Sequence, residues 1–346
     1  MAWYAYFDQS GAWAPRGTTA DDRLMPSGTL MVQFNTYECV YGSALLSFAA
    51  HEPWHRTIAL HLDDKGNPEI RITSSGQSVV KTKSQFVNRS AAKDILVTYA
   101  WDAPNRTARL TVSDTTSFQG HTETITGAPP LFRSDLLALA SQVIGSPVAF
   151  TALSDTPEPI GPMPGIDPLT MIDTPTGLRR AGELKSGDQV ETDAGPQTIL
   201  ARLNRALPAV GAFKPVRLCA PFHGLKRHLT VAQHQSLVFG GADVEYAFGD
   251  QTVHIPSGQL EARGQPVFEP GLRLYCQFLL PKPSGVLAQG AILSSINIGR
   301  LRRHQSDLAM TLLSHLPTEL LPEHGDAEPQ ALPEYAFRML ADGRAM

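Results

Sequence analysis

The sequence of 346 residues has little cysteine, no excess of positive charge and no apolar run long enough to cross a membrane. Its three cysteines, Cys39, Cys219 and Cys276, are odd in number, lie far apart and form no CxxC pair. This spacing favours neither a disulfide framework nor a zinc knuckle, and we interpret the cysteines as three separate thiols. The formal net charge of −4 argues against a nucleic-acid-binding face.

The N-terminus also lacks the pattern of a signal peptide. Residues 1–8 read Met-Ala-Trp-Tyr-Ala-Tyr-Phe-Asp and contain no charged segment that an apolar stretch follows. We therefore expect no classical secretion signal. The sequence leaves two compartments open, the cytoplasm and an exported state reached by a non-classical route.

The composition is that of a folded protein, with 42% hydrophobic and 18% charged residues. A chain of this length predicts two domains, each large enough to bury its own core. Between them lies a stretch in which prolines favour extended backbone and exclude a helix. These prolines are Pro157, Pro159, Pro162, Pro164 and Pro168. We place the domain boundary in this stretch.

The predicted fold class is mainly β, with four segments in order. Residues 1–150 are expected to form a jelly-roll-like sandwich, and residues 151–164 a proline-rich linker. A second β domain is expected over 165–299, followed by a helical tail over 300–346. Short alternating strands separated by turns favour β-sandwiches and barrels over parallel α/β folds.

The alternation is clearest in two predicted hairpins. Residues 57–62 alternate, a turn rich in Asp, Gly, Asn and Pro follows, and residues 69–73 alternate back. Residues 97–101 and 108–112 repeat this arrangement around Asp-Ala-Pro-Asn-Arg. The stretch 99–112 resembles a hairpin of laminin-G and concanavalin-A-like jelly rolls.

Helices are predicted at three places. Residues 133–145 favour a short helix with Ser134 as its N-cap. Residues 300–320 favour a second helix because four leucines fall on one side. These are Leu301, Leu308, Leu312 and Leu313. A third helix is expected at Glu334–Ala341.

The segment His51-Glu-Pro-Trp-His55 has the HExxH spacing of zinc proteases, and His61 falls where an extended pattern has its third ligand. That chemistry needs both histidines on one face of a helix, with Glu52 as general base. Pro53 would break such a helix at a cost of about 3 kcal/mol. The residues after His55 alternate with period two, as in a strand. We therefore reject a metal site here and expect no cofactor.

Three further segments follow one another in the second half of the chain. Residues 168–177 read Pro-Leu-Thr-Met-Ile-Asp-Thr-Pro-Thr-Gly, residues 184–190 contain Gly-Asp-Gln-Val, and residues 229–237 read Leu-Thr-Val-Ala-Gln-His-Gln-Ser-Leu. Their order and spacing resemble the Hint module of hedgehog autoprocessing domains and inteins, in its bacterial form. The resemblance covers about residues 165–299.

Hint modules cleave themselves through an acyl shift, in which a nucleophile attacks the carbonyl just before it and a histidine assists. By this resemblance, the nucleophile position is Gly165, which has no attacking atom, and the matching histidine is His234. A Ser or Thr usually stands three residues before the histidine, and here that residue is Val231. Thr170 fits a further position of the pattern. The resemblance thus implies a degenerate autoprocessing domain.

We therefore predict a Hint-domain protein without enzymatic activity that acts as a binding or assembly module for a protein or glycan partner. One alternative is active, intein-like autoproteolysis near 164–168, with Thr170 or Asp167 as a substitute nucleophile. Another is carbohydrate binding by the N-terminal sandwich through Trp54 and Trp101.

Overall fold

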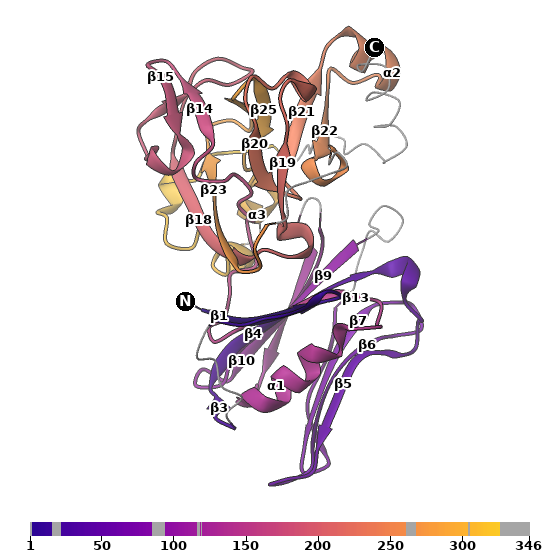
Figure 1. The fold of residues 1–346 in the computed structure, drawn as a ribbon. Coiled ribbons are helices and arrows are strands. Elements are labelled where there is room, and N and C mark those ends of the chain that lie inside the picture. Colours follow the sequence, from indigo (N-terminus) through magenta and orange to yellow (C-terminus); the bar gives the residue numbers. More distant parts are fainter. Residues whose placement is uncertain are drawn as a thin grey trace. The chain divides into compact units, whose positions relative to one another are not determined.

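The computed structural model describes residues 2–15, 22–84, 94–115, 118, 120–260, 268–303 and 305–325. The chain folds into two compact units (Figure 1). Unit 1 comprises Met1–Ile160 with Pro270–Leu272, and unit 2 comprises Gly161–Glu269 with Arg273–Met346. None of the described helices has the length and hydropathy that crossing a bilayer requires.

Unit 1 contains a seven-stranded sheet in the order β11-β10-β9-β4-β13-β1-β2. Its strands are β1 (Trp3–Asp8), β2 (Gly11–Trp13), β4 (Ser27–Asn35), β9 (Asp94–Asp102), β10 (Thr107–Asp114), β11 (Gly120–Thr126) and β13 (Val148–Ser154). A four-stranded sheet consists of β5 (Ala44–Ala50), β6 (Arg56–Leu62), β7 (Pro68–Ser74) and β8 (Gln77–Lys83). The short strands β3 (Leu24–Met25) and β12 (Leu131–Phe132) pair with each other.

The two larger sheets of unit 1 share one hydrophobic core. Leu60 and Ile70 from the smaller sheet belong to the same buried cluster as Val97, Tyr99 and Leu110 from the larger one. The unit is therefore an antiparallel β-sandwich, as the sequence predicts. Both predicted hairpins are confirmed, because β6 pairs with β7 and β9 pairs with β10 in antiparallel register.

The first predicted helix forms as α1 (Arg133–Ala140), but the predicted N-cap, Ser134, is wrong. The helix begins directly after β12, with Phe132 at the N-cap and no side-chain capping bond, so Ser134 lies inside the first turn. A 3-10 turn at Ser141–Val143 follows. The helix buries Leu136 and Leu139 in the sandwich core.

Strand β13 corrects the start of the predicted linker. Residues 151–154 pair with β4 on one side and with β1 on the other, so they belong to the sandwich. The physical reason is that Val148–Ser154 still supplies apolar residues to the core, and the prolines begin only at Pro157.

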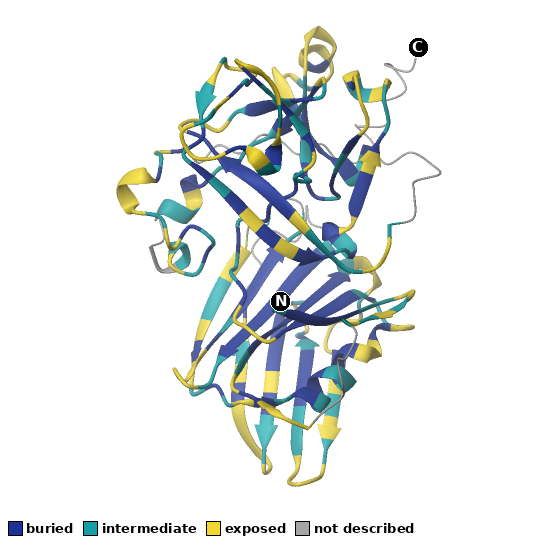
Figure 2. Ribbon diagram, turned by 60° about the vertical axis from the view of Figure 1, so that its left-hand side comes forward, coloured by how far each residue is buried: buried dark blue, intermediate teal, exposed yellow. Residues whose placement is uncertain are grey.

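Unit 2 is also mainly β. Its six-stranded sheet has the order β15-β14-β24-β25-β21-β22, and β16-β17, β18-β23 and β19-β20 form separate pairs. The strands are β14 (Met171–Thr174), β15 (Gly177–Arg180), β16 (Gln189–Val190), β17 (Gln197–Thr198), β18 (Ala201–Pro208), β19 (Pro215–Leu218), β20 (Leu229–Ala232), β21 (Ser236–Gly240), β22 (Thr252–Pro256), β23 (Leu272–Leu279), β24 (Gly285–Ala288) and β25 (Ala291–Ser294). In both units the buried residues gather along the strands and the exposed residues at the turns (Figure 2).

The helices of unit 2 are short: α2 (Ala242–Phe248), α3 (Gly299–Arg303) and α4 (Gln305–Leu308). Turns of 3-10 type lie at Thr36–Glu38 in unit 1 and, in unit 2, at Ala181–Glu183, Gly211–Phe213, Phe222–Gly224, Ser257–Leu260 and Thr318–Leu320.

The single helix predicted over 300–320 is wrong. The Thr311 hydroxyl donates to Leu308 O and accepts from Leu313 N, and such side-chain bonds compete with helical ones. The predicted leucines nevertheless pack together in one cluster with Ile298. The helix predicted at Glu334–Ala341 lies outside the described residues.

Candidate functional site

The first Hint-like segment runs between two strands of unit 2. Ile166 forms bridges to Val231 on β20 and to Cys276 on β23, and the backbone of Cys276 exchanges bonds of 3.0 and 2.8 Å with Ile166. The carbonyl of Gly165 accepts a bond of 2.7 Å from Ala232 N. These contacts place Gly165 beside the loop that follows β20, which carries His234.

Gly165 and His234, the two positions that the sequence singles out, lie next to each other. A β-carbon at position 165 would stand 3.1 Å from Nε2 of His234 and only 2.8 Å from both Cβ and Oε1 of Gln235. Real β-carbons essentially never lie within 3.0 Å of another heavy atom, because close-packed atoms stay at van der Waals distance. The Cβ of Gln235 is fixed to its backbone and cannot move aside as the end of a side chain can. The space that an attacking side chain would need is therefore filled.

His234 is buried, and each of its ring nitrogens lies near a backbone carbonyl. Its Nδ1 lies 3.0 Å from Ala212 O and its Nε2 lies 3.1 Å from Met163 O. The ring of Phe213 stands nearly perpendicular to the imidazole, with the ring centroids 5.7 Å apart. Burial lowers the pKa of His234, and the two carbonyl contacts only partly oppose that effect. A neutral imidazole donates from one nitrogen only, so the neutral ring bonds one of these two carbonyls at a time.

A buried polar network that the sequence did not reveal surrounds the Gly165 position. Gln277 Nε2 donates to Gln235 Oε1 at 2.8 Å, and Gln235 Nε2 donates to O and Oγ of Ser294, both at 3.1 Å. Both glutamines are almost fully buried. The sequence does carry one indication of this network: a glutamine directly follows His234, and a second glutamine lies among the apolar residues of β23.

The other positions that the resemblance singles out have structural partners. The Thr170 hydroxyl donates to Thr230 O at 3.2 Å. Val231 is fully buried and pairs with Val216 on β19. The Asp167 carboxylate accepts from Leu169 N at 2.8 Å in a local turn.

The cysteines are free thiols, and one of them lies near the first segment. Cys276 Sγ is 3.5 Å from Ile166 O, and burial raises the pKa of its thiol to about 12. Because the thiolate is the nucleophilic form, the raised pKa makes Cys276 a weak nucleophile at neutral pH. Burial likewise raises the pKa of Cys39 to about 11.

The HExxH residues do not lie on a helix. His51, Glu52 and His55 stand in the loop between β5 and β6, with the two imidazole rings 5.0 Å apart, and His61 lies on β6. Across the described residues, no three His, Cys, Asp or Glu side chains come together as a metal-binding group.

The two tryptophans that the sequence suggested for carbohydrate binding differ in exposure. Trp101 is fully buried, and its indole donates to Met25 O at 3.3 Å. Trp54 is exposed but lies against Phe132, with ring centroids 5.6 Å apart. Trp101 is a core residue, so it cannot serve as a sugar platform.

Solved structures with related arrangements were found. A sialidase carbohydrate-binding module (CBM40) of Ruminococcus gnavus, solved with α2,3-sialyllactose, has 13% identity and a TM-score of 0.30 over 46% of this chain and 90% of its own. A SAP-like pentraxin of Limulus polyphemus has 7% identity and a TM-score of 0.22 over 43% of this chain and 62% of its own. No curated protein matches the chain.

A family model described as the Hint domain matches residues 165–300. The match includes Gly165, the loop with His234 and the strands around the glutamine network. Residues 165–300 of this chain are therefore a Hint domain.

Proposed function

We propose that the Hint domain has lost self-cleavage and that the protein acts as a non-catalytic binding or assembly module. The observation that supports this most strongly is the closed space at Gly165. The position has no nucleophile, and Gln235 fills the place where one would stand.

The acyl shift needs an attacking atom, a group that polarises or protonates the scissile amide, and a hydroxyl that holds the bond. In this chain the carbonyl to be attacked belongs to Pro164. Gly165 provides no attacking atom, Val231 provides no hydroxyl, and both ring nitrogens of His234 face other carbonyls. The three losses support the same conclusion independently.

The intact mass of freshly expressed protein tests the proposal. We expect one stable species of the full 37.5 kDa chain. Fragments that end or begin within residues 164–168 would contradict the proposal and favour active autoproteolysis. In that case, Thr170→Val and Asp167→Ala distinguish the two substitute nucleophiles, because only the variant that removes the attacking group abolishes the fragments.

A further inference from the structure

The segment of unit 2 between Asp193 and Asp243 contains no acidic residue. Its charged side chains are all cationic: Arg202, Arg205, Lys214, Arg217, Lys226 and Arg227. In a chain with a net charge of −4, this is a local excess of positive charge, and such an excess favours an anionic partner. Lys226 and Arg227 lie in the loop 219–228 that joins β19 to β20, which we call the basic loop (Figure 1).

The basic loop exposes an aromatic ring together with its cations. The side chain of Phe222 is 65% exposed, and Lys226, Arg227 and His228 are exposed as well. Within the described part of the chain, neither Lys226 nor Arg227 forms an ion pair. The loop therefore offers uncompensated positive charge within a few residues of an apolar ring.

The backbone of the basic loop is held against unit 2. Leu225 is buried in the core of this unit. Lys226 N donates to Gln289 O at 2.7 Å, and Ala220 N donates to Nδ1 of His228 at 3.2 Å. An ordered loop of this kind loses little backbone entropy when it contacts a partner.

The turn between β24 and β25 supports the loop from the same side. Gly290 in this turn has a φ of +94°, and a β-carbon there would lie 2.5 Å from Gly224 O and 3.0 Å from Lys226 N. The close approach requires glycine at position 290. It fixes the backbone of the loop on both sides of Leu225.

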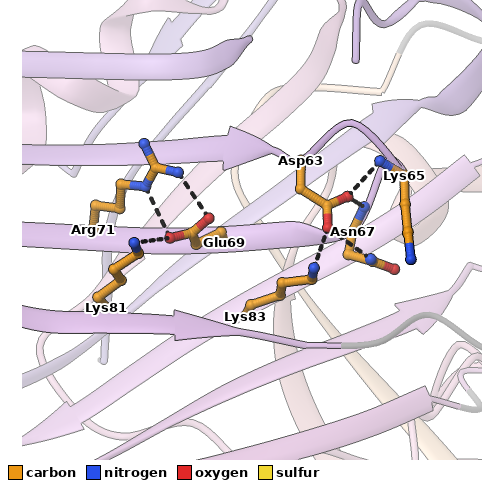
Figure 3. Close-up of polar contacts among 7 residues, drawn as sticks. All are labelled: Asp63, Lys65, Asn67, Glu69, Arg71, Lys81 and Lys83. Carbon is orange, nitrogen blue, oxygen red and sulfur yellow. Dashed lines mark hydrogen bonds and ion pairs between the residues drawn. The ribbon is translucent and has the colours of Figure 1, made fainter. Parts of the chain in front are cut away.

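A second cluster of exposed cations, on β7 and β8 of unit 1, differs in its charge balance (Figure 3). Arg71 Nε and Lys81 Nζ lie 2.9 and 3.9 Å from the same oxygen of Glu69, and Lys83 contacts the carboxylate of Asp63. Each of these cations has a carboxylate beside it, so much of its charge is neutralised. The cations of the basic loop have no such partner.

The combination of side chains favours one class of partner. Exposed cations are attracted to an anionic surface, and an apolar ring gains free energy when it leaves water. The boundary between headgroups and acyl chains of an anionic bilayer meets both demands, because Lys and Arg contact the headgroups while a Phe ring enters beneath them. The position of the loop at the end of the β19–β20 hairpin suits contact with such a surface.

Nucleic acid fits these side chains less well. Proteins that bind single strands follow the phosphate backbone with a positively charged groove and stack successive bases on several aromatic rings. The basic loop has only two permanent cations, Lys226 and Arg227, and a single Phe as its ring platform.

We propose that the basic loop binds the surface of a membrane that contains anionic phospholipids, with Phe222 in the headgroup region and Lys226 and Arg227 on the lipid headgroups. The inference goes beyond the proposed loss of self-cleavage and uses neither Gly165 nor His234. The two proposals fail separately, because intact mass measures cleavage and says nothing about lipid binding.

Co-sedimentation of the full-length protein with vesicles tests the proposal. The probe vesicles contain phosphatidylcholine and phosphatidylglycerol in equal parts, and the reference vesicles contain phosphatidylcholine alone. We expect weak, reversible binding to the anionic vesicles and none to the reference vesicles. Concentrated salt is expected to release the protein, because it screens exposed charges.

Charge variants then locate the contact. Lys226→Ala and Arg227→Ala are each expected to weaken binding about fivefold, the contribution of one cation near an anionic leaflet. Lys81→Ala is the matched control, because it changes the net charge equally but removes a cation that already lies beside Glu69. We expect this control to bind like the parent protein.

Aromatic variants test the role of the ring. Phe222→Ala is expected to weaken binding about tenfold, because it removes most of the apolar area that enters the headgroup region. Tyr37→Ala removes a 77% exposed ring from unit 1 and is the control that leaves binding unchanged. Circular dichroism that matches the parent protein shows that each variant is folded.

Three results would overturn the proposal. The first is no co-sedimentation of the folded parent protein with anionic vesicles. The second is vesicle binding that the combined Lys226→Ala and Arg227→Ala variant retains in full. The third is binding of a single-stranded oligonucleotide that both substitutions abolish, with no binding to vesicles, which would assign the loop to nucleic acid.

Discussion

At the scale of single residues, Gly165 is the position at which the proposed loss of self-cleavage can be tested. Gly165→Cys restores an attacking sulfur, but its Cβ would overlap Gln235. We expect this variant to lose about 1–3 kcal/mol of unfolding free energy, as overpacked cores do, and to remain uncleaved. Chemical denaturation and intact mass measure the two effects.

The matched control is Gly325→Ala, because a β-carbon at Gly325 meets nothing within 4 Å. We expect the control to change stability by less than about 0.5 kcal/mol. Equal stability of Gly165→Cys and the parent protein would show that the space is not closed.

His234 gives a second residue-scale prediction, on pH. Its pKa is lowered in the folded protein, whereas in the unfolded chain it is about 6.5. The unfolded state therefore takes up the proton first as pH falls. The contribution to stability is fully present above about pH 6.5 and is lost as pH falls toward the lowered pKa.

Urea unfolding of the parent protein and of His234→Gln between neutral and acidic pH measures this contribution. We expect the parent to lose more unfolding free energy on acidification than the variant, since the variant lacks the group that must be protonated. His254, whose pKa burial lowers to about 4, contributes to both proteins alike. Parallel pH profiles would contradict the assignment to His234.

At the scale of elements, one ion pair anchors helix α1 to the smaller sheet of the sandwich. Arg56 on β6 makes two bonds to Asp135 on α1, at 2.5 and 2.9 Å, and its guanidinium lies 4.3 Å from the ring centre of Phe132. Both side chains are largely buried, at 12% and 4% exposure. Removing one partner leaves a buried charge without compensation.

We expect Asp135→Ala to cost about 3 kcal/mol of unfolding free energy, because Arg56 stays behind unpaired. Urea unfolding followed by tryptophan emission measures the loss. Glu123→Ala, which removes the exposed contact with His121 at 2.8 Å in the same unit, is the control and is expected to cost about 0.5 kcal/mol or less. Replacing Arg56 and Asp135 together by apolar residues is expected to recover much of the loss.

At the scale of the whole molecule, the two units have separate hydrophobic clusters. The cluster of unit 1 centres on residues such as Trp101 and Leu110, and that of unit 2 on residues such as Phe278 and Leu237. The sequence has four tryptophans, and all belong to unit 1: Trp3, Trp13, Trp54 and Trp101. Tryptophan emission therefore reports the unfolding of unit 1.

We expect Phe278→Ala to lower the stability of unit 2 by about 3–5 kcal/mol. Calorimetry would show the loss, while the midpoint of tryptophan emission stays near that of the parent protein. Leu110→Ala provides the converse case and lowers the emission midpoint. If Phe278→Ala shifts the emission midpoint as much as Leu110→Ala does, the units unfold together.

Local patterns determined the β class, the two hairpins and the absence of a nucleophile. Alternation in residues 57–62 is a property of the chain itself, because successive side chains of a strand point to opposite faces. In the same way, a glycine at position 165 lacks an attacking atom in any fold. The patterns failed where side chains compete with the backbone, as Thr311 does in the predicted helix 300–320.

Tertiary structure alone decided what surrounds these residues. It placed Gln235 in the space beside Gly165, with Gln277 and Ser294 from distant strands as its hydrogen-bond partners, and it buried Trp101 while leaving Trp54 exposed. The periodicity of a sequence indicates on which face of a strand or helix a side chain lies. It does not indicate which distant segment packs against that face. Whether a position is a core, a filled pocket or an open one depends on packing between segments far apart in the chain.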